Sequence, residues 1–347
     1  MPSAHGRCEH GRLSGMSKPR IGLFGTGPWA QMTHGPALAA HPGIELSGVW
    51  GRRPDAAGSL ADTLATSAYS GDDGVDALIA ASDALAFALP PDIQAPLAAR
   101  AAAAGKHLLL DKPVATTVEG AREVADAAVR AGVFSVVFFT ARFEPATARW
   151  IDEQAAAGDW FTAHAHWLGS LYPEDPEGQQ KPDNPDNPDN PDNTDNPDNP
   201  DKTDNPFAAS PWRREKGGLW DVGPHALSVL LPLLGDVADV TAVRTEPDLT
   251  HLVLRHAAGA ASSVALSLSA PKAGSGNAVE LRGRHGVARM PEGRGGAQQS
   301  FESAIDALLE AVRTGRPHDV DARFAARVTE ILAEAEHGIA ASGASGA

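Results

Sequence analysis

The sequence predicts an α/β protein whose N-terminal domain is a doubly wound parallel sheet and whose C-terminal α+β domain carries an open, mostly antiparallel sheet. From Arg20 to about Thr140, short apolar runs alternate with Ala-rich helical stretches, which is typical of a parallel sheet wrapped by helices. After Arg142 the later apolar runs follow one another without helices between them, which favours antiparallel strands. We therefore expect one domain over residues 18–141 and a second over 142–341.

The predicted N-terminal domain is an alternation of buried strands and helices. The strands are the apolar runs at 21–25, 44–50, 84–89, 107–110 and 133–139. The helices, several of which open at Pro or Thr and close at Gly, are 28–41, 54–65, 91–105 and 116–132. Sheets built in this way bind nucleotides at the carboxyl ends of their strands.

The predicted C-terminal domain opens with a helix at 145–157 and a strand at 160–170. After a central insert, a helix at about 218–234 precedes further strands, and two helices close the chain. The further strands are 239–247, 250–256, 261–270 and 278–286, and the closing helices are about 298–314 and 321–340.

An acidic repeat, KPDNPDNPDNPDNTDNPDNPDKTDNP, occupies residues 181–206. Pro recurs at nearly every third position and no apolar side chain is present to bury, so we expect neither helix nor sheet there. Asp at a period of three lacks the ligand pattern and the Gly turn of a calcium loop, so the repeat predicts no metal site. Together with its flanks it predicts a disordered insert at 173–207.

Charge and composition argue against several classes of partner. The formal net charge is −15, of which the repeat contributes −6, and the rest is mildly acidic with no basic block for nucleic acid. No apolar run reaches the roughly 18 residues of a membrane span. Cys8 is the only cysteine, which excludes an intrachain disulfide and a cysteine metal cluster and fits a cytoplasmic location. Residues 1–17 lack the apolar core of a signal peptide and are predicted to be a disordered extension, with Met16 as an alternative start.

The segment GTGPWA, residues 25–30, follows a predicted strand and opens a predicted helix, which is the context of a dinucleotide fingerprint. Gly25 permits the tight turn, Gly27 lets a pyrophosphate approach the backbone, and Ala30 lets the helix pack on the strand. A plain strand-to-helix turn is the alternative. The cofactor contacts expected in this turn are Gly25, Thr26, Gly27, Trp29 and Ala30.

The end of the second predicted strand, VWGRRPDAA, bears on the choice of cofactor. An acidic residue at this point accepts from the ribose of NAD, whereas the 2′-phosphate of NADP requires a cation. Gly51 is near the expected acidic position, and Arg52 and Arg53 follow it. The sequence therefore favours NADP(H), while Asp55 is close enough to leave NAD(H) open. An Arg pair in solvent at a helix start is the alternative.

The segment LLLDKPVATT, residues 108–117, places Asp111 and Lys112 at the carboxyl end of a buried strand, where open α/β sheets bind ligands. Pro113 biases Lys112 toward an extended conformation, so the lysine is expected to extend from the strand end. Beside a nicotinamide, its ammonium could polarise or protonate a substrate oxygen. A surface lysine in a loop is the reading that local sequence alone supports.

The segment KGGLWDVGPHALSVL, residues 216–230, places Asp221 and His225 four residues apart on a predicted helix, hence on one face. This spacing lets a carboxylate orient an imidazole, which can move a proton near neutral pH while a hydride moves to a nicotinamide. An ordinary Asp and His at a helix start is the alternative.

In their order these motifs resemble the Gfo/Idh/MocA family of NAD(P)-dependent oxidoreductases. The resemblance extends from about Arg20 to Ala340, apart from the repeat. It rests on GLFGTGPWA, ALPPDIQAPLAARAAAAGKHLLLDKP, FFTARFEPA, PWRREKGGLWDVGPH, ELRGRHG and the closing GRPHDVDARFAARVTEILAEAEHGIAAS. It implies a Rossmann domain for the cofactor and a sheet domain that shapes the substrate pocket, with the insert in a loop beside that pocket.

The resemblance also implies catalytic roles for Lys112, Asp221 and His225. Hydride is expected to pass between the nicotinamide and a carbon bearing a hydroxyl or carbonyl group, on a sugar, a polyol or a related small cyclic compound. Lys112, or His225 oriented by Asp221, is expected to exchange the proton. A non-catalytic NAD(P)-binding regulator and an NAD-dependent glycoside hydrolase are the alternatives. A homo-oligomer, dimer or tetramer, is expected.

Other residues are expected at the site because they lie in the family's motifs. Gln94 replaces a common His and Asp111 replaces the usual Glu, so the details of cofactor contact are open there. The cofactor contacts expected from these motifs are Leu89, Pro90, Gln94, Asp111 and Lys112.

Weaker candidates lie in the segments that approach the predicted active site. An arginine fork suits a carboxylate or a polyhydroxylated substrate, and structural roles are the alternative. His164 and His166 share one face of a strand, but no third ligand has a suitable spacing, so no metal site is predicted. The candidate substrate residues are Arg142, Trp212 and Arg213.

Overall fold

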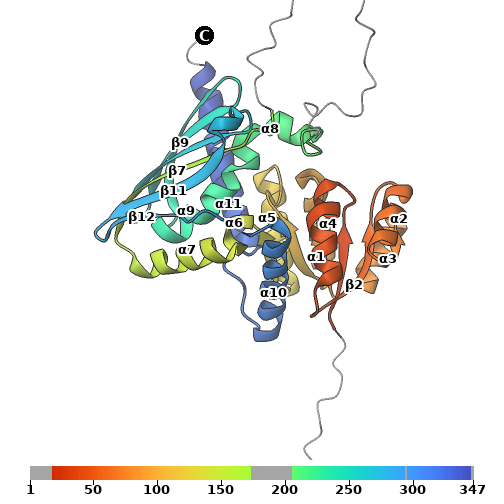
Figure 1. Cartoon of the computed structure of the whole chain (residues 1–347). Helices are drawn as coiled ribbons and strands as arrows, with labels where there is room; N and C mark the ends of the chain where they lie inside the picture. The colour runs from red at the N-terminus through yellow and green to blue at the C-terminus, as the bar shows by residue number, and fades with distance from the viewer. Residues whose placement is uncertain (1–17, 173–204, 294, 345–347) are drawn as a thin grey trace, which may run out of the picture.

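The computed structural model describes residues 18–172, 205–293 and 295–344, and contains two six-stranded sheets, one in each half of the chain (Figure 1). The extension predicted over 1–17 and nearly all of the insert predicted at 173–207 lie outside the described residues. None of the described helices combines the length and the apolar run that a membrane span requires.

The first sheet has the strand order β3-β2-β1-β4-β5-β6, and its pairings are parallel, as in a doubly wound sheet. This confirms the predicted fold of the N-terminal domain. β3 was not predicted, because two residues are too few to show a periodic pattern. The strands are β1 (Arg20–Phe24), β2 (Glu45–Trp50), β3 (Ala68–Tyr69), β4 (Ala84–Phe87), β5 (His107–Asp111) and β6 (Ser135–Phe138).

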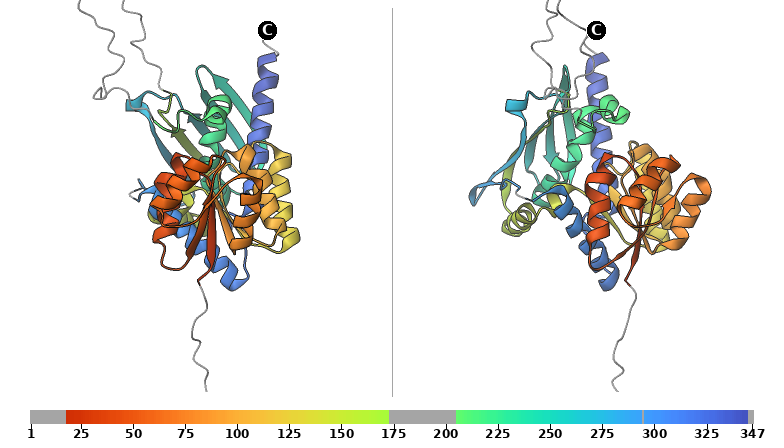
Figure 2. Two further views of the ribbon diagram at one scale, coloured as in Figure 1. Left: turned by 90° about the vertical axis from the view of Figure 1, so that its right-hand side faces the viewer. Right: turned by 45° about the vertical axis from the view of Figure 1, so that its right-hand side comes forward.

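Helices lie on both sides of this sheet (Figure 2). The helix predicted over 28–41 is divided, because a π-helical turn precedes α1. α3 was not predicted, since its opening residues GDDG have low helix propensity. The helices are η1 (Ala30–His34), α1 (Gly35–Ala40), α2 (Pro54–Thr63), α3 (Gly71–Ala81), α4 (Pro91–Ala103) and α5 (Val118–Ala131).

The second sheet has the strand order β12-β11-β7-β10-β9-β8, and its pairings are antiparallel except that of β10 with β7. This confirms the open, mostly antiparallel sheet. Residues of β9 alternate between buried and exposed, because helices cover only one face of the sheet. The strands are β7 (Trp160–Leu168), β8 (Val237–Thr245), β9 (Leu249–His256), β10 (Ala261–Ser267), β11 (Gly276–Gly283) and β12 (Gly286–Arg289).

The remaining helices follow the first sheet along the chain, and two of them pack against the first domain. α10 packs on β6 and η1 of the first domain, and α11 contacts both α5 and β8, so one hydrophobic core continues through both domains (Figure 2). These helices, with one 3-10 turn, are α6 (Thr140–Phe143), α7 (Pro145–Ala157), α8 (Pro211–Asp221), α9 (Gly223–Leu234), η2 (Lys272–Gly274), α10 (Ala297–Thr314) and α11 (Ala322–Ala344).

The helix predicted over about 218–234 is wrong at its N-terminal end, because the chain forms two helices that meet at Val222. α8 also changes direction at Gly217, whose φ of 65° lies in the left-handed region that favours glycine. A Cβ at Gly218 would lie 2.7 Å from the Cα of Ser267, so α8 approaches β10 closely. Asp221 therefore ends one helix and His225 lies in the first turn of the next.

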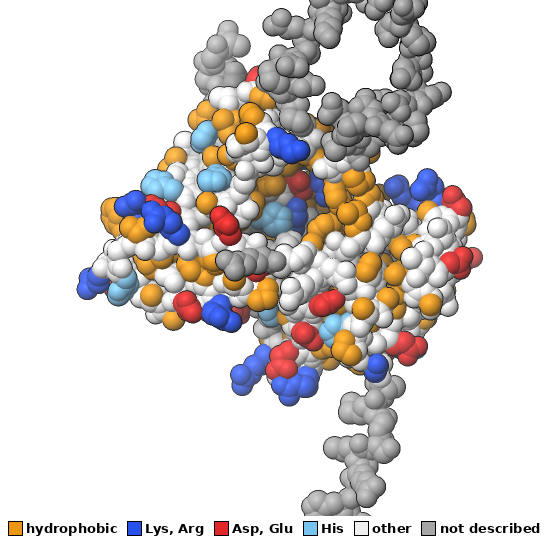
Figure 3. Space-filling model, viewed as in Figure 1, with side chains coloured by type: hydrophobic (Ala, Val, Ile, Leu, Met, Phe, Trp, Pro, Cys, Tyr) orange, Lys and Arg blue, Asp and Glu red, His pale blue; other side chains and the backbone are white. Residues whose placement is uncertain are grey.

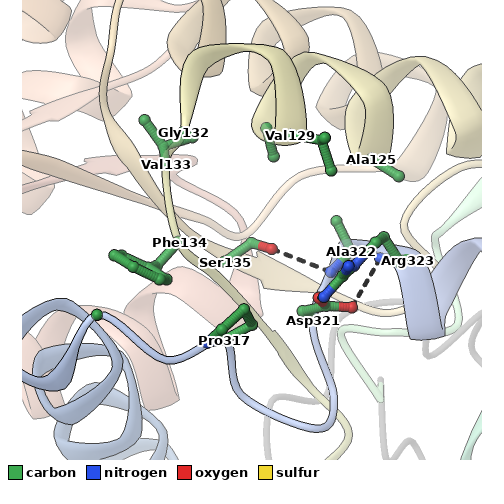
Figure 4. Close-up of a pocket in the computed structure, with 12 residues that line it drawn as sticks. Ala125, Val129, Gly132, Val133, Phe134, Ser135, Pro317, Asp321, Ala322 and Arg323 are labelled. Atoms are coloured by element: carbon green, nitrogen blue, oxygen red, sulfur yellow. Dashed lines mark hydrogen bonds and ion pairs between the residues drawn. The ribbon is translucent and has the colours of Figure 1, made fainter.

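Hydrogen bonds join the start of α11 to the amino end of β6 (Figure 4). This end of the first sheet lies opposite the carboxyl ends of its strands. Ser135 Oγ accepts a hydrogen bond from the Ala322 N–H at 3.0 Å. Asp321 caps the helix by accepting from the N–H groups of Arg323 and Phe324. A mainly apolar cavity of about 270 Å³ adjoins this junction.

His34 lies in η1 and is fully buried, with its ring centroid 3.9 Å from that of Phe301 and 5.9 Å from that of Phe138. Burial lowers the pKa of His34 to about 3, so the imidazole is neutral near pH 7.

We predict that His34→Phe reduces the acid sensitivity of the fold. Between pH 6.5 and about 3 the histidine binds a proton in the unfolded state but not in the folded state. The free energy of unfolding therefore decreases as the pH is lowered, by up to about 1.4 kcal/mol per pH unit. Urea unfolding at pH 7, 6 and 5 should show a smaller loss of stability in the variant. Parallel curves for the two proteins would contradict this.

Candidate active site

Three adjoining cavities lie where the carboxyl ends of β1, β4 and β5 meet the second domain. Figure 3 shows acidic, basic and histidine side chains gathered in the hollow between the two halves. The outer cavity, about 590 Å³, is lined by residues 25–27, 51–53 and 88–90. The middle cavity, about 240 Å³, and the inner cavity, about 330 Å³, share Trp29, Asp111, Lys112, Phe207 and Arg213.

The glycine-rich turn after β1 forms the floor of the outer cavity. Gly25 has φ +130°, and a Cβ there would lie 2.3 Å from the carbonyl oxygen of Ala88, so only glycine fits. A Cβ at Gly27 would meet nothing within 4 Å, which leaves its backbone open to a ligand. Ala30 is fully buried in the core cluster. The turn thus has the steric properties expected of a dinucleotide fingerprint.

Arg52 and Arg53 line the outer cavity and are exposed at the end of β2. Gly51 is buried, and a Cβ there would lie 2.6 Å from Cγ2 of Thr26. A longer acidic residue at this position would therefore displace Thr26. Asp55 is exposed in the first turn of α2 and is not among the residues that line the cavity.

Aromatic side chains line the middle cavity, and two of them, Trp29 and Phe207, also line the inner cavity. Trp29 meets Phe207 edge to face, with 5.6 Å between ring centroids, so the glycine-rich turn contacts the segment that enters α8. The Arg213 guanidinium lies 4.8 Å from the ring of Trp212 and 5.7 Å from that of Phe207. Leu89 and Pro90 also line the middle cavity, and their contact with a cofactor stays a prediction.

Lys112 bridges the two domains at the junction of the middle and inner cavities. Its Nζ donates to the main-chain oxygen of Asp221 at 2.7 Å and to Asp221 Oδ1 at 2.9 Å. Arg213 Nε donates to the same Oδ1 at 3.2 Å. The side chains of Lys112 and Asp221 are each only 11% exposed. One buried carboxylate therefore accepts from two cations.

This arrangement controls the charge of Asp221. Burial by itself raises the pKa of the carboxyl, but the ammonium of Lys112 and the guanidinium of Arg213 outweigh it and lower the pKa to about 2. Asp221 is therefore ionised at any pH at which the protein works.

His225 lines the inner cavity, where it was expected, but its imidazole is not held by Asp221. The hydrogen bonds described for the Asp221 carboxylate go to Lys112 and Arg213, so the two cations hold the carboxylate in place of the imidazole. Burial, reinforced by Lys112, lowers the pKa of His225 to about 3. The imidazole is thus neutral and can accept or donate a hydrogen bond.

Asp111 lines both the middle and the inner cavity. Its Oδ1 accepts from the main-chain N–H of Lys112 at 2.8 Å. Burial raises the pKa of Asp111 to about 6, with Asp221 adding to the rise and Lys112 and Arg213 opposing it. Asp111 therefore changes charge close to the pH of the cell, next to both cavities.

Two expected contacts lie elsewhere. Gln94 does not line any of the three cavities, and its side chain binds the main chain of the loop around Lys112. Arg142 is also absent from the cavity walls, because its Nη1 donates to the main-chain oxygen of Ser228 in α9 at 3.0 Å. The position of a residue in a motif does not show whether its side chain lines a cavity or packs behind the residues that do.

Part of the inner cavity wall has no signal in the sequence. Much of it comes from the ends of β7 and β10, the parallel pair, which are joined by a hydrogen bond from Gly169 N–H to the Ser267 oxygen. No local pattern indicates a pairing between segments about 100 residues apart. The missed residues are Thr140, Gly169, Ser170, Leu171, Asn205, Phe207 and Leu268.

Within the described parts of the chain, no three His, Cys, Asp or Glu side chains converge in a way that could hold a metal ion. His164, one of the two strand histidines, instead pairs with Ser263 Oγ through Nδ1 at 2.7 Å.

Comparison with known proteins agrees with this architecture. Residues 19–139 match the family model described as the Gfo/Idh/MocA oxidoreductase family, NAD-binding Rossmann fold. The uncharacterized oxidoreductase YdgJ of Escherichia coli is 30% identical over 68% of this chain and 62% of its own. A dTDP-3,4-didehydro-2,6-dideoxy-alpha-D-glucose 3-reductase of Streptomyces violaceoruber is 34% identical over 33% of each chain.

A solved structure shares the whole fold. Levoglucosan dehydrogenase, in complex with NADH and levoglucosan, superposes with a TM-score of 0.72 at 19% identity, over 93% of this chain and 98% of that one. The alignments with the curated relatives above, by contrast, cover less than two thirds of those proteins.

The fold and cavities define an NAD-binding Rossmann protein with a second sheet domain. The chain belongs to the Gfo/Idh/MocA oxidoreductase family.

We predict that Asp221→Asn destabilises the protein more than Lys112→Met. The first change leaves two buried cations without a carboxylate, which should cost about 3–5 kcal/mol, whereas the second leaves Arg213 paired with Asp221. Urea unfolding at pH 7 measures both. Equal losses, or a larger loss in Lys112→Met, would show that the two cations do not depend on this carboxylate.

Proposed function

We propose that the protein is an NAD(P)-dependent oxidoreductase that transfers a hydride between a nicotinamide and a hydroxyl- or carbonyl-bearing carbon of a sugar, polyol or related small cyclic compound. The observation that carries the proposal is the position of Lys112, whose ammonium stands between the middle and inner cavities and is anchored by Asp221.

The chain's own residues fit a dinucleotide. Gly25 and Gly27 leave the backbone of the first turn open, and the carboxyl ends of β1 and β4 flank it as in sheets that bind such cofactors. A bound nicotinamide would supply or accept the hydride. Trp29 and Phe207, which line both the middle and the inner cavity, would then limit the access of water to the nicotinamide.

Proton transfer falls to the groups around the inner cavity. The Lys112 ammonium can donate a hydrogen bond to a substrate oxygen and stabilise negative charge that develops on it. The neutral imidazole of His225 can hold the same oxygen and exchange its proton. Asp221 fixes Lys112 and Arg213 in place and stays ionised, so its role is to position the cations.

The printed names of relatives support the substrate class. The relative from Streptomyces violaceoruber is a reductase of a nucleotide-linked deoxysugar, and the levoglucosan dehydrogenase complex contains a sugar anhydride. The inner cavity of about 330 Å³ has room for a ligand of monosaccharide size.

The two alternatives predict different sites or products. A regulator could dispense with acid-base groups, whereas Lys112, Asp221 and His225 all line the inner cavity here. A glycoside hydrolase that recycles its cofactor would release sugar without a net change in absorbance at 340 nm. Screening sugars, cyclitols and dihydrodiols with NADP⁺ at that wavelength detects the oxidoreductase, and assaying glycosides for sugar release distinguishes the hydrolase from a regulator, which shows neither activity.

We predict that Lys112→Met and His225→Asn each lower turnover by about tenfold or more, because both groups act on the reacting oxygen. Affinity for NADP(H), measured by fluorescence titration, should stay within about threefold. Lys272→Met in the exposed η2 turn is the matched control and should leave turnover unchanged. Full turnover in both site variants would rule out the assignment.

We propose NADP(H) as the preferred cofactor, because Arg52 and Arg53 line the outer cavity where Gly51 leaves no carboxylate. The double change Arg52→Ala with Arg53→Ala should weaken NADP⁺ binding by about tenfold or more and NAD⁺ binding much less. Arg130→Ala on α5 is the control. An equal loss of affinity for NADP⁺ and NAD⁺ would show that Arg52 and Arg53 do not bind the 2′-phosphate.

We further propose a homo-oligomer in the cytoplasm that is paired through the open face of the second sheet. Val243, Val253 and Val287 lie on this face and are 46–55% exposed, which leaves apolar surface that a second copy could cover. Light scattering after size exclusion should give a dimer or tetramer. Val253→Asp should shift it toward smaller species, and a monomeric wild-type protein would contradict the proposal.

A further inference from the structure

Gln94, in the first turn of α4, lies directly behind the loop that carries Lys112. Its side chain is fully buried and makes four hydrogen bonds to the main chain of residues 111–114. Oε1 accepts from the Asp111 N–H at 2.9 Å. The two N–H groups of Nε2 are shared among three carbonyl oxygens, those of Asp111 at 2.8 Å, Val114 at 3.2 Å and Pro113 at 3.3 Å. These partners determine the orientation of the amide, because the Asp111 N–H needs an oxygen acceptor and the carbonyl oxygens need an N–H donor.

The strand pairing shows what this amide replaces. β5 pairs with β6 as far as Asp111, but it pairs with β4 only as far as Leu109. β4 ends at Phe87, and the chain then turns away through residues 88–90 to form a wall of the outer and middle cavities. The main chain of Asp111 would lose its partner on that side. The Gln94 amide supplies one acceptor and one donor in place of the missing strand.

Hydrogen bonds hold both ends of Lys112, its main chain on the side of Gln94 and its ammonium on Asp221. Gln94 holds the main chain of Asp111, and Asp111 Oδ1 accepts from the main-chain N–H of Lys112. Lys112 Nζ in turn reaches Asp221 in the other domain. Any shift of the loop would therefore move the ammonium relative to the inner cavity.

We propose that Gln94 is a positioning residue for the hydride-transfer reaction, which sets where the Lys112 ammonium stands by completing the edge of β5. The inference rests on the proposed function, because it assumes that Lys112 acts on the substrate. It reassigns Gln94 from a cofactor contact to a support of the catalytic loop.

Substitutions of Gln94 differ in which of these hydrogen bonds they retain. Gln94→Met fills similar space but offers neither donor nor acceptor. Gln94→Glu keeps the acceptor for Asp111 N–H but places a second oxygen against three carbonyl oxygens in a buried site. We therefore expect Gln94→Glu to be the more damaging change. Gln298→Met on the exposed surface of α10 is the matched control.

The experiment measures turnover, substrate KM, NADP(H) affinity and melting temperature in these variants. Gln94→Met should lower kcat by about tenfold or more while KM and NADP(H) affinity stay within about threefold, since only the reacting geometry changes. In a Lys112→Met background the same change should have little further effect on kcat, because Gln94 acts through Lys112. Gln298→Met should match the wild type.

Three outcomes would overturn the inference. They are a kcat within about threefold of wild type in Gln94→Met, an equal fall in kcat with and without Lys112, and a loss of NADP(H) affinity that accounts for the whole effect. Wild-type turnover in Lys112→Met would instead overturn the proposed role of Lys112, and the inference with it. If Gln94→Met does not fold, Gln94→Asn, whose amide is one methylene shorter, is judged by the same criteria.

Discussion

The contact between Lys112 and Asp221 is the interaction on which the cleft depends. It joins the end of β5 in the first domain to the end of α8 in the second, and both side chains are almost fully buried. Removing charge from water is costly, so such a pair persists only where geometry and further hydrogen bonds compensate. Arg213 and the main-chain oxygen of Asp221 provide that compensation. The middle and inner cavities therefore share one group of charged side chains, formed by Lys112, Arg213 and Asp221.

Unusual backbone features converge on this centre. Gly25 lets the first turn pass close to the carbonyl oxygen of Ala88, Gly217 redirects α8, and α8 ends at Asp221. The carboxylate of Asp221 accepts from the two cations, and the imidazole of His225 is neutral beside the inner cavity. The turn after β1 and the end of α8 thus bring these groups to adjoining cavities.

The architecture could be predicted because buried parallel strands read as short apolar runs and their helices begin and end at recognisable residues. Lys112 and Asp111 could be placed for the same reason, since they follow such a strand. Gly223 and Pro224 mark the start of the second helix in the sequence, since Pro suits the first turn, but helical spacing alone predicted one continuous helix over this stretch. The role of Gln94 and the wall formed by β7 and β10 depend on pairings between distant segments, which have no local pattern.

A crystal structure of the protein with NADP⁺ bound would show where the nicotinamide lies relative to Lys112. We predict that it lies beside Lys112 in the middle cavity, with the lysine Nζ still on Asp221 and the ribose phosphate next to Arg52 and Arg53. A nicotinamide placed away from Lys112, or a lysine that has left Asp221 and points out of the inner cavity, would contradict it.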